Sequence, residues 1–408
     1  MDLFNVVSID QTKKIIEENI NLEVSYETIK LEESLGRVLY EDIVANIDVP
    51  GFNRSTVDGY AVYSKDLFGA SESMPSMLTL KGEVFMGKEP EGGLDFPGDC
   101  YYVPTGGMLP EGADSMVMIE YTDKLDDNTI LANTSVAQGQ NIVKKGEDIL
   151  KGEVIIKAGV KLRPYEIGVL SSLGYTKVPV YKKPKIAIIS TGDEIVHPHE
   201  EPKLGQVRDI NTYLLYASVK ADGGEPISYG VIRDNYELLK STMEKALREC
   251  DAILVSGGSS VGKKDQTYKV IESLEKSKML IHGIAVKPGK PTIIGKVDNK
   301  IIFGLPGHPL SCAVIYDVVV KPYIHKALGY EEILFPTQCK FDINYHKAKG
   351  REEYLPITLE WREGEIIASP VFGKSGLITG FSKAWGYIRI DKNEEGLKEG
   401  QTVYAFKF

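Results

Sequence analysis

The middle of the chain alternates short apolar runs with longer amphipathic segments. Continuous apolar runs, which predict buried strands, cover 185–190, 226–232, 251–256 and 300–305. Segments 209–222 and 236–250 instead place apolar residues three and four apart, the spacing of one helix face. Strands that alternate with helices usually form a parallel sheet covered on both faces. The pattern therefore predicts an α/β domain with a parallel-type sheet over 184–328.

Other helices are predicted from local signals. Ser8 and Gln11 have the spacing of a capping box at the start of an N-terminal helix. A second short helix is expected over 32–39, and a third over 163–173, where a proline stands at a favoured first position. One long helix over 308–328 is expected to end the α/β domain.

Two stretches have the short strands and frequent turn residues of β-rich parts. In the first, strand-like segments 84–85, 117–119 and 154–156 lie between turns rich in Gly, Pro and Asp. In the second, strands are expected at 340–345, 354–361, 366–371 and 387–390. Trp361 and Trp385 are expected to pack within this small all-β domain. The pattern changes near residues 50, 140, 184 and 329, which makes the chain multidomain, α/β plus β.

Charge and composition exclude several classes of protein. The 408 residues carry 48 Lys+Arg and 58 Asp+Glu, a formal net charge of −10 without a basic run, so no nucleic-acid partner is expected. The four cysteines form no Cys-x-x-Cys pair, which argues against a zinc site and a disulfide framework and fits a reducing cytoplasm. We find no signal peptide and no apolar run of about 20 residues, so no membrane span is expected.

Polar residues and glycines follow the ends of the predicted strands. The segments are Thr191–Glu194, Arg233–Asp234, Ser256–Gly262 with Asp265, Lys287–Lys290 and Leu305–Pro309. In an open α/β sheet, ligands bind beyond the carboxyl ends of the strands. Turns explain each glycine separately, but they do not explain why carboxylates and lysines gather on one edge. We therefore expect a ligand site at this edge.

The residue types at this edge suit an anionic ligand. Gly257 and Gly258 allow backbone N–H groups to approach oxyanions, and the lysines supply positive charge. The carboxylates of Glu194, Asp234 and Asp265 would repel an anion unless a hard cation such as Mg²⁺ lay between them. A simpler interpretation stays open for the two aspartates, because each could cap the helix that follows it. The chain has no Walker A motif, and no G-x-G-x-x-G motif follows a strand.

Further polar residues lie in segments that could equally be ordinary turns. Asp58, Thr105 and Asp148 stand in Asp-Gly, Thr-Gly-Gly and Gly-Glu-Asp sequences of the N-terminal half. His197 and His199 could suggest a metal pair, but their Pro- and Glu-rich surroundings favour a solvated loop.

Six segments, taken in their order, resemble one known family. They are Val57–Ala61, Gly146–Ile149, Ser190–Glu194, Ser256–Gly262 with Asp265, Lys287–Pro291 and Leu305–Pro309. With them the chain resembles the MoeA family, the molybdopterin molybdenumtransferases, which is related to the C-terminal domain of gephyrin. The resemblance runs from about residue 5 to the C-terminus.

This resemblance implies a protomer of four parts. The expected parts are a discontinuous elongated N-terminal domain of 1–50 and 140–183, an inserted β-rich domain of 51–139, a molybdopterin-binding α/β domain of 184–328 and a β-barrel-like domain of 329–408. The family is typically a homodimer whose site lies between the α/β part of one subunit and the N-terminal parts of the other.

The resemblance also implies the reaction and its residues. The family inserts molybdate, or tungstate, into adenylylated molybdopterin with release of AMP and with Mg²⁺, and an adenylyltransferase is the expected partner that hands over the substrate. The implied catalytic carboxylates are Asp58, Asp148, Glu194, Asp234 and Asp265, of which Glu194, Asp234 and Asp265 would bind the metal. The implied cofactor or molybdate contacts are Thr105, Ser256, Gly257, Gly258, Lys287, Lys290, Pro306 and Pro309.

The chain departs from the family pattern at three places, and two other functions stay open. His308 stands where the family motif usually has Asn, Lys263-Lys264 stands where the family more usually has an acidic residue before Asp265, and Thr56-Val57 alters the segment before Asp58. The chain could instead be a molybdopterin adenylyltransferase, although such an enzyme would not need Asp58, Asp148 and the C-terminal domain. It could also be a non-catalytic binding or scaffold protein, although the carboxylate set is complete.

Overall fold

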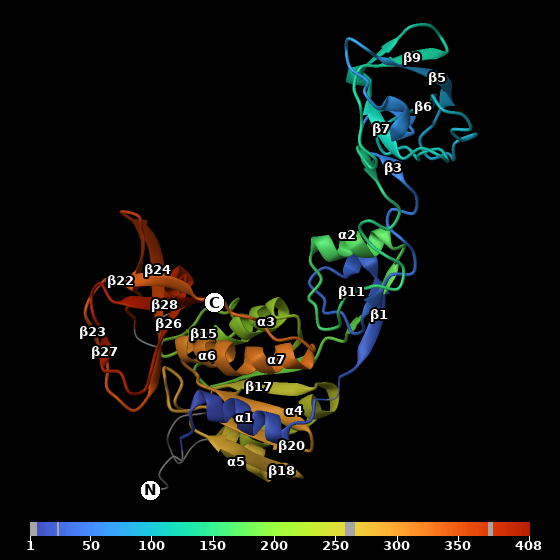
Figure 1. The fold of residues 1–408 in the computed structure, drawn as a ribbon. Helices are drawn as coiled ribbons and strands as arrows, with labels where there is room; N and C mark the ends of the chain where they lie inside the picture. Colours follow the sequence, from blue (N-terminus) through green and yellow to red (C-terminus); the bar gives the residue numbers. More distant parts are fainter. Residues whose placement is uncertain (1–5, 23, 258–265, 374–377) are drawn as a thin grey trace. The chain divides into compact units, whose positions relative to one another are not determined.

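The computed structural model describes residues 6–22, 24–257, 266–373 and 378–408 (Figure 1). The chain divides into two compact units. The first comprises residues 1–28, 36–40 and 179–408, and the second comprises 29–35 and 41–178. The four-part division suggested by the resemblance stays a prediction.

The first unit contains a six-stranded sheet. Its strands, in spatial order, are β16 (Glu225–Ile232), β13 (Lys185–Thr191), β17 (Ala252–Ser256), β21 (Lys300–Leu305), β20 (Ile293–Val297) and β18 (Ser277–His282). β13 pairs in parallel with β16 and β17, and β17 with β21. β20 runs antiparallel to both of its neighbours, so every strand except β20 points the same way. The predicted parallel-type sheet is confirmed.

Helices cover both faces of this sheet, because alternate residues of its strands point to opposite sides. Ile186 and Ile188 of β13 pack in one core cluster with residues of α1 (Ile9–Asn19), α3 (Asn211–Ala221) and α6 (Pro309–Ile315). Ala187 and Ile189 pack in another cluster with residues of α4 (Tyr236–Glu249) and α5 (Gln266–Ser273). Figure 1 shows these helices on the two sides of the sheet.

The local helix predictions succeed only in part. Ser8 caps α1 in a complete capping box with Gln11, as predicted. The helix expected over 32–39 is wrong: strand β1 (Tyr26–Lys30) leads into a single 3-10 turn, η1 (Leu31–Glu33). The segment 308–328 is not one regular helix but α6, a π-helical turn η4 (Tyr316–Val320) and α7 (Lys321–Ala327). Pro322 has no N–H for the preceding turn and crowds the carbonyl four residues before it, which favours this wider turn.

The C-terminal strands close into a barrel. They are β22 (Thr337–Phe341), β24 (Glu352–Arg362), β25 (Glu365–Pro370), β26 (Gly386–Ile390) and β28 (Thr402–Lys407). β24 pairs with β25 and β26, β28 with β22 and β26, and β22 with β25, so the ring is complete. The barrel-like prediction is confirmed. Trp385 packs against the barrel core, whereas Trp361 is 70% exposed, which corrects the expectation for that residue.

The second unit holds another six-stranded sheet. Its spatial order is β7 (Ser115–Met118), β4 (Gly59–Val62), β6 (Asp99–Val103), β5 (Ser76–Glu83), β9 (Thr129–Ala132) and β8 (Thr122–Lys124). Small pairs join β3 (Arg54–Ser55) to β10 (Ile142–Val143) and β2 (Ile43–Val44) to β11 (Val154–Ile156). Helix α2 (Pro164–Ser172) begins at Pro164 as predicted, but β5 ends before the strand expected at 84–85.

The remaining short elements are β12 (Lys177–Tyr181), β14 (Ile195–Val196), β15 (Val207–Arg208), β19 (Val286–Lys287), β23 (Tyr345–His346), β27 (Gly396–Leu397), η2 (Ser64–Leu67), η3 (Ile119–Tyr121) and α8 (Ile378–Lys383). All four cysteines are buried free thiols. Across the described ranges, no helix is both long and apolar enough to span a membrane.

Candidate active site

The loops that follow β13, β17 and β21 meet at the carboxyl edge of the first unit's sheet. Gly257, directly after β17, has φ +102°, and a Cβ placed on it would lie 2.2 Å from the Thr191 carbonyl oxygen. A Cβ on Gly307, after β21, would lie 3.5 Å from the Gly257 Cα. Only glycine fits at 257, because its conformation and its close approach to the backbone both exclude a side chain. The expected meeting of these strand ends is present in the fold.

Asn211 ties two of these loops together, and the sequence analysis missed it. This buried residue begins α3, and its Nδ2 donates to the Ser256 Oγ at 2.6 Å and to the Gly307 carbonyl oxygen at 2.8 Å. A carbonyl can only accept, so the amide nitrogen must face Gly307. Ser256 is itself only 1% exposed, so its hydrogen bond with Asn211 is buried beneath the loop that follows β17. Nothing in the local sequence marks Asn211 apart from its place at a helix start.

Two acidic segments meet at the same edge. The Asp234 Oδ1 accepts from the Thr191 Oγ1 at 3.1 Å, and the Asp234 N–H donates to the Asp193 Oδ1 at 3.2 Å. Glu194 folds back over Gly192, where an added Cβ would lie 2.8 Å from the Glu194 Oε2. Within the described ranges, none of the three carboxylates has an ion-pair partner. The edge therefore carries exposed negative charge that no ion pair compensates within the part of the chain that the structure describes.

The helix-cap interpretation of Asp234 is wrong. The cap of α4 is the next residue, Asn235, whose Oδ1 accepts from the Leu238 N–H at 2.9 Å. Asp234 is therefore not engaged by the helix end. The same question for Asp265 stays open, because Asp265 and Gly258 lie outside the described residues, as do Lys263 and Lys264.

The loop with the two lysines, 287–290, follows β18, the strand at the other end of the same sheet. The Lys287 Nζ lies 2.9 Å from the Glu353 Oε1, and the Lys287–Pro288 peptide bond is cis. A Cβ on Gly289 would lie 2.6 Å from Ile315, so the loop packs directly on α6. The Lys290 carbonyl accepts from the N–H groups of Ile284 and Thr292. These two hydrogen bonds hold the loop closed as the chain turns back toward β20.

Other predicted contacts flank the edge. Pro306 and Pro309 are buried on either side of exposed Gly307 and His308. Cys312, one turn into α6, lies in hydrogen-bonding contact with Ser256, and burial raises the pKa of its thiol to about 12. Cys312 therefore stays protonated and is a packing residue rather than a nucleophile.

The second unit brings together two of its three predicted residues. The Thr105 N–H donates to the Asp58 Oδ1 at 2.8 Å. The next residue, Gly59, is required by close packing, because a Cβ there would lie 2.0 Å from the Val117 carbonyl oxygen. Asp148 is exposed in another loop, where its N–H donates to the Val49 carbonyl oxygen at 3.1 Å.

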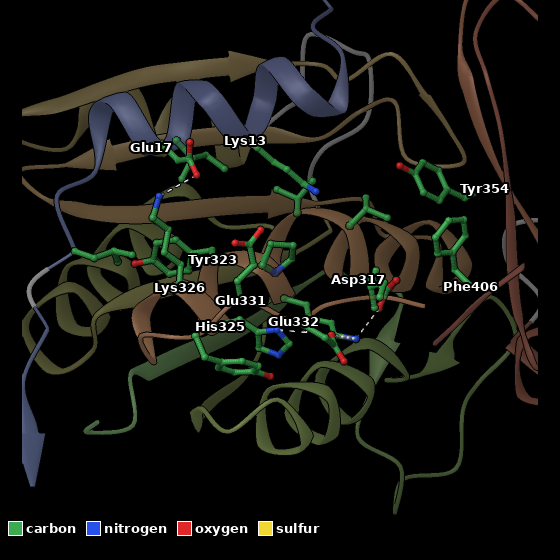
Figure 2. Close-up of a pocket in the computed structure, with 18 of the residues that line it drawn as sticks. Lys13, Glu17, Asp317, Tyr323, His325, Lys326, Glu331, Glu332, Tyr354 and Phe406 are labelled. Atoms are coloured by element: carbon green, nitrogen blue, oxygen red, sulfur yellow. Dashed lines mark hydrogen bonds and ion pairs between the residues drawn. The ribbon is translucent and has the colours of Figure 1, made fainter. Parts of the chain in front are cut away.

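A cavity of about 610 Å³ lies elsewhere in the first unit. Figure 2 shows Lys13 and Glu17 of α1, residues of α7 and the barrel residues Tyr354 and Phe406 around it. Its charges largely pair with one another, as in Lys326–Glu17 at 2.8 Å. The cavity contains none of the predicted site residues, so we place the candidate site at the sheet edge.

Comparisons with known proteins match the chain from end to end. Sequence models of protein families match residues 7–174 as the MoeA N-terminal region (domain I and II), 187–326 as a "Probable molybdopterin binding domain" and 338–408 as the MoeA C-terminal region (domain IV). The molybdopterin molybdenumtransferase of Staphylococcus epidermidis is 32% identical over 395 residues, covering 96% of this chain and 93% of that protein. The chain belongs to the MoeA family.

Further relatives agree with this membership. The molybdopterin molybdenumtransferase of Haemophilus influenzae is 32% identical and covers 98% of both chains. The crystal structure of the molybdopterin biosynthesis MoeA protein from Pyrococcus horikosii has a TM-score of 0.86 and 38% identity, with 99% of each chain covered. The MoeA resemblance predicted both the family and the class of enzyme, and these similarities confirm both predictions.

Proposed function

We propose that this chain is a molybdopterin molybdenumtransferase that inserts molybdate or tungstate into adenylylated molybdopterin and releases AMP. The observation that carries the proposal is the end-to-end similarity to relatives of that name. The geometry of the sheet edge supports it, because the glycine loop after β17 contacts Thr191, which lies next to carboxylates that have no ion-pair partner among the described residues. Both substrates are anions, so the edge must attract negative charge while keeping the two molecules together.

The carboxylates fit a divalent cation. Glu194 and Asp234, with Asp265, would hold Mg²⁺, which binds one or two carboxylates and keeps several water molecules. Glu194 and Asp234 have no ion-pair partner among the described residues, which leaves both carboxylates available for this role. When bound, the cation would offset the repulsion between the two anionic substrates. In this proposal Asp58 and Asp148 are the further catalytic carboxylates.

The anion contacts divide by chemistry. Lys287 and Lys290 supply positive charge to phosphate or molybdate, and Gly257 and Gly258 are proposed to form a cradle in which an anion can approach the backbone closely. The Gly257 N–H itself already donates to the Leu305 carbonyl oxygen at 3.3 Å, so the contribution of Gly257 is space rather than a donor. Asn211 and Ser256 hold the loops of that cradle in place through the hydrogen bonds described above. Thr105, Pro306 and Pro309 are proposed to line the substrate.

Reconstitution tests the proposal. Purified chain is mixed with adenylylated molybdopterin, Mg²⁺ and either molybdate or tungstate, and both AMP and metal-loaded cofactor are measured. Oxyanion-dependent AMP release that stops with EDTA supports insertion. AMP transfer from ATP to molybdopterin would instead identify an adenylyltransferase, and tight binding without turnover would identify a carrier or scaffold.

We also propose a cytoplasmic homodimer whose sites combine Asp58 of one subunit with Glu194 of the other, with substrate handed over by an adenylyltransferase. Asp58→Asn and Glu194→Gln chains, each inactive alone, are mixed after denaturation and refolded together. Random pairing would rebuild about a quarter of the sites in a C2 dimer. Activity returns only if the site is shared between subunits, and sites confined to one chain give none.

A further inference from the structure

The C-terminal barrel contacts the lysine loop of the α/β sheet through a two-stranded pairing. β19 lies parallel to β24, with Lys287 paired to Glu353 and Val286 to Glu352. The Glu352 N–H donates to the Ala285 carbonyl oxygen at 3.1 Å. Paired residues of neighbouring strands point to the same side of a sheet, so the register itself brings the side chains of Lys287 and Glu353 together.

The two members of this ion pair differ in burial. The Lys287 side chain is 55% exposed, whereas the Glu353 side chain is 6% exposed, and their charged atoms lie 2.9 Å apart. The Tyr345 Oη donates to the same Glu353 Oε1 at 2.7 Å. The carboxylate is therefore fixed by the barrel, and the ammonium lies between this fixed anion and solvent.

The second carboxylate oxygen of Glu353 lacks a hydrogen-bond donor in the described part of the chain. This oxygen, Oε2, is also buried. A buried charged oxygen without a donor opposes folding. Its neighbour Glu352 shows the usual arrangement: one oxygen accepts from the Tyr354 Oη and the other from the Arg389 Nη2 at 2.9 Å. Stability alone therefore does not account for the carboxylate at 353.

We infer that Glu353 is a positioning residue that holds the ammonium of Lys287 toward the sheet edge for an oxyanion of the substrate. An ammonium has three N–H donors, and the pair with Glu353 occupies one side of it, leaving the others directed away from the barrel. The barrel thus contributes to the anion site through Lys287. This inference rests on the proposed function for the identity of the oxyanion, but not for the pairing itself.

The experiment compares Glu353→Gln with the matched variant Glu352→Gln in the full-length chain. In the molybdenumtransferase assay, Glu353→Gln raises the KM for molybdate about tenfold, the value of one lost charge-assisted interaction, while kcat stays within about twofold. Glu352→Gln leaves both unchanged, and Glu353→Asp, which keeps the charge, recovers part of the KM. A KM that rises equally in the two glutamine variants would overturn the inference, as would a loss of kcat alone.

A second readout needs neither substrate nor turnover. Lysines are acetylated at low reagent dose, and the rate at Lys287 is measured by mass spectrometry relative to exposed Lys157 in the same sample. Glu353→Gln releases the amine and speeds its acetylation several-fold, and Glu352→Gln does not. Equal rates in wild type and Glu353→Gln would overturn the pairing even in a chain that inserts no molybdate, so failure of the inference and of the proposed function are told apart.

Discussion

Gly257 lies directly against the backbone of Thr191, so that a Cβ on Gly257 would stand 2.2 Å from the Thr191 carbonyl oxygen. This contact joins the ends of β13 and β17, the strands that carry the acidic segment and the glycine loop of the candidate site. Among the described residues of the sheet edge it is also the strictest requirement on residue type, because backbone cannot move aside as a flexible side chain can.

Gly257→Ala is expected to destabilise the chain by roughly 2–4 kcal/mol and to abolish turnover, since it combines backbone strain with overpacking. Denaturant unfolding measures the first effect and the molybdenumtransferase assay the second. Gly205→Ala is the control: Gly205 also has positive φ, +89°, but an added Cβ meets nothing within 4 Å. It is expected to lose only about 1 kcal/mol. Equal losses at the two sites would mean that the contact with Thr191 is unimportant.

Asp234 and Asn235 are adjacent, but the structure gives them different roles. Asn235→Ala removes the cap of α4 and is expected to cost about 1 kcal/mol while activity remains. Asp234→Asn keeps the fold, because Asp234 is exposed and caps no helix, but is expected to lower kcat by at least about 100-fold. Thermal unfolding and turnover of both variants test this. Full transfer activity in Asp234→Asn would remove that carboxylate from the mechanism.

Two half-buried aspartates of the first unit, Asp222 and Asp317, should respond to pH with opposite signs. Burial favours the neutral form of Asp222, but hydrogen bonds from His325 and Tyr316 and the charge of Lys321 outweigh burial and hold its pKa below 3.8. The ionised form therefore stabilises the fold above pH 3.8, and this contribution is lost as pH falls through the folded-state pKa. Asp222→Asn should cost about 1–3 kcal/mol at pH 7, with the gap to wild type closing below pH 3.8.

Burial raises the pKa of Asp317 above 3.8, although the charge of Lys321 opposes the rise. A raised pKa contributes its full stability below the unfolded-state pKa, and this contribution is lost as pH rises through the folded-state pKa. Asp317→Asn should therefore be as stable as wild type, or more stable, at pH 7. Denaturant unfolding from pH 3 to 7 compares both variants. A large loss at pH 7 in Asp317→Asn would contradict this sign.

Because Glu353 is buried and Lys287 is exposed, removing one partner of the pair should destabilise the fold more than removing the other. Lys287→Met leaves the buried Glu353 carboxylate with Tyr345 alone and should destabilise the chain by about 3 kcal/mol. Glu353→Gln leaves a lysine that can turn to water and should cost less than about 1 kcal/mol. Chemical denaturation at neutral pH distinguishes them. A greater loss in Glu353→Gln than in Lys287→Met would contradict the burial argument.

Local sequence predicted well wherever one element decides its own conformation. The capping box at Ser8, the proline start of α2 and the apolar strand β17 were all predictable, because each signal lies within a few neighbouring residues. The expected helix over 32–39 failed because helix-forming residues there are overridden by the pairing of the chain around them. Pairing between strands that are far apart in the sequence cannot be detected from a short stretch of sequence.

The amino-acid sequence by itself determined the α/β core, the edge at which polar residues gather and the family to which the chain belongs. Apolar periodicity and turn residues are local, and the carboxyl ends of parallel strands must meet at one edge. Tertiary structure alone decided that Asn211 joins two loops, that Asn235 rather than Asp234 caps α4, and that Glu353 holds Lys287 across 66 positions of chain. These relationships depend on register and burial between distant segments, which only the folded chain brings together.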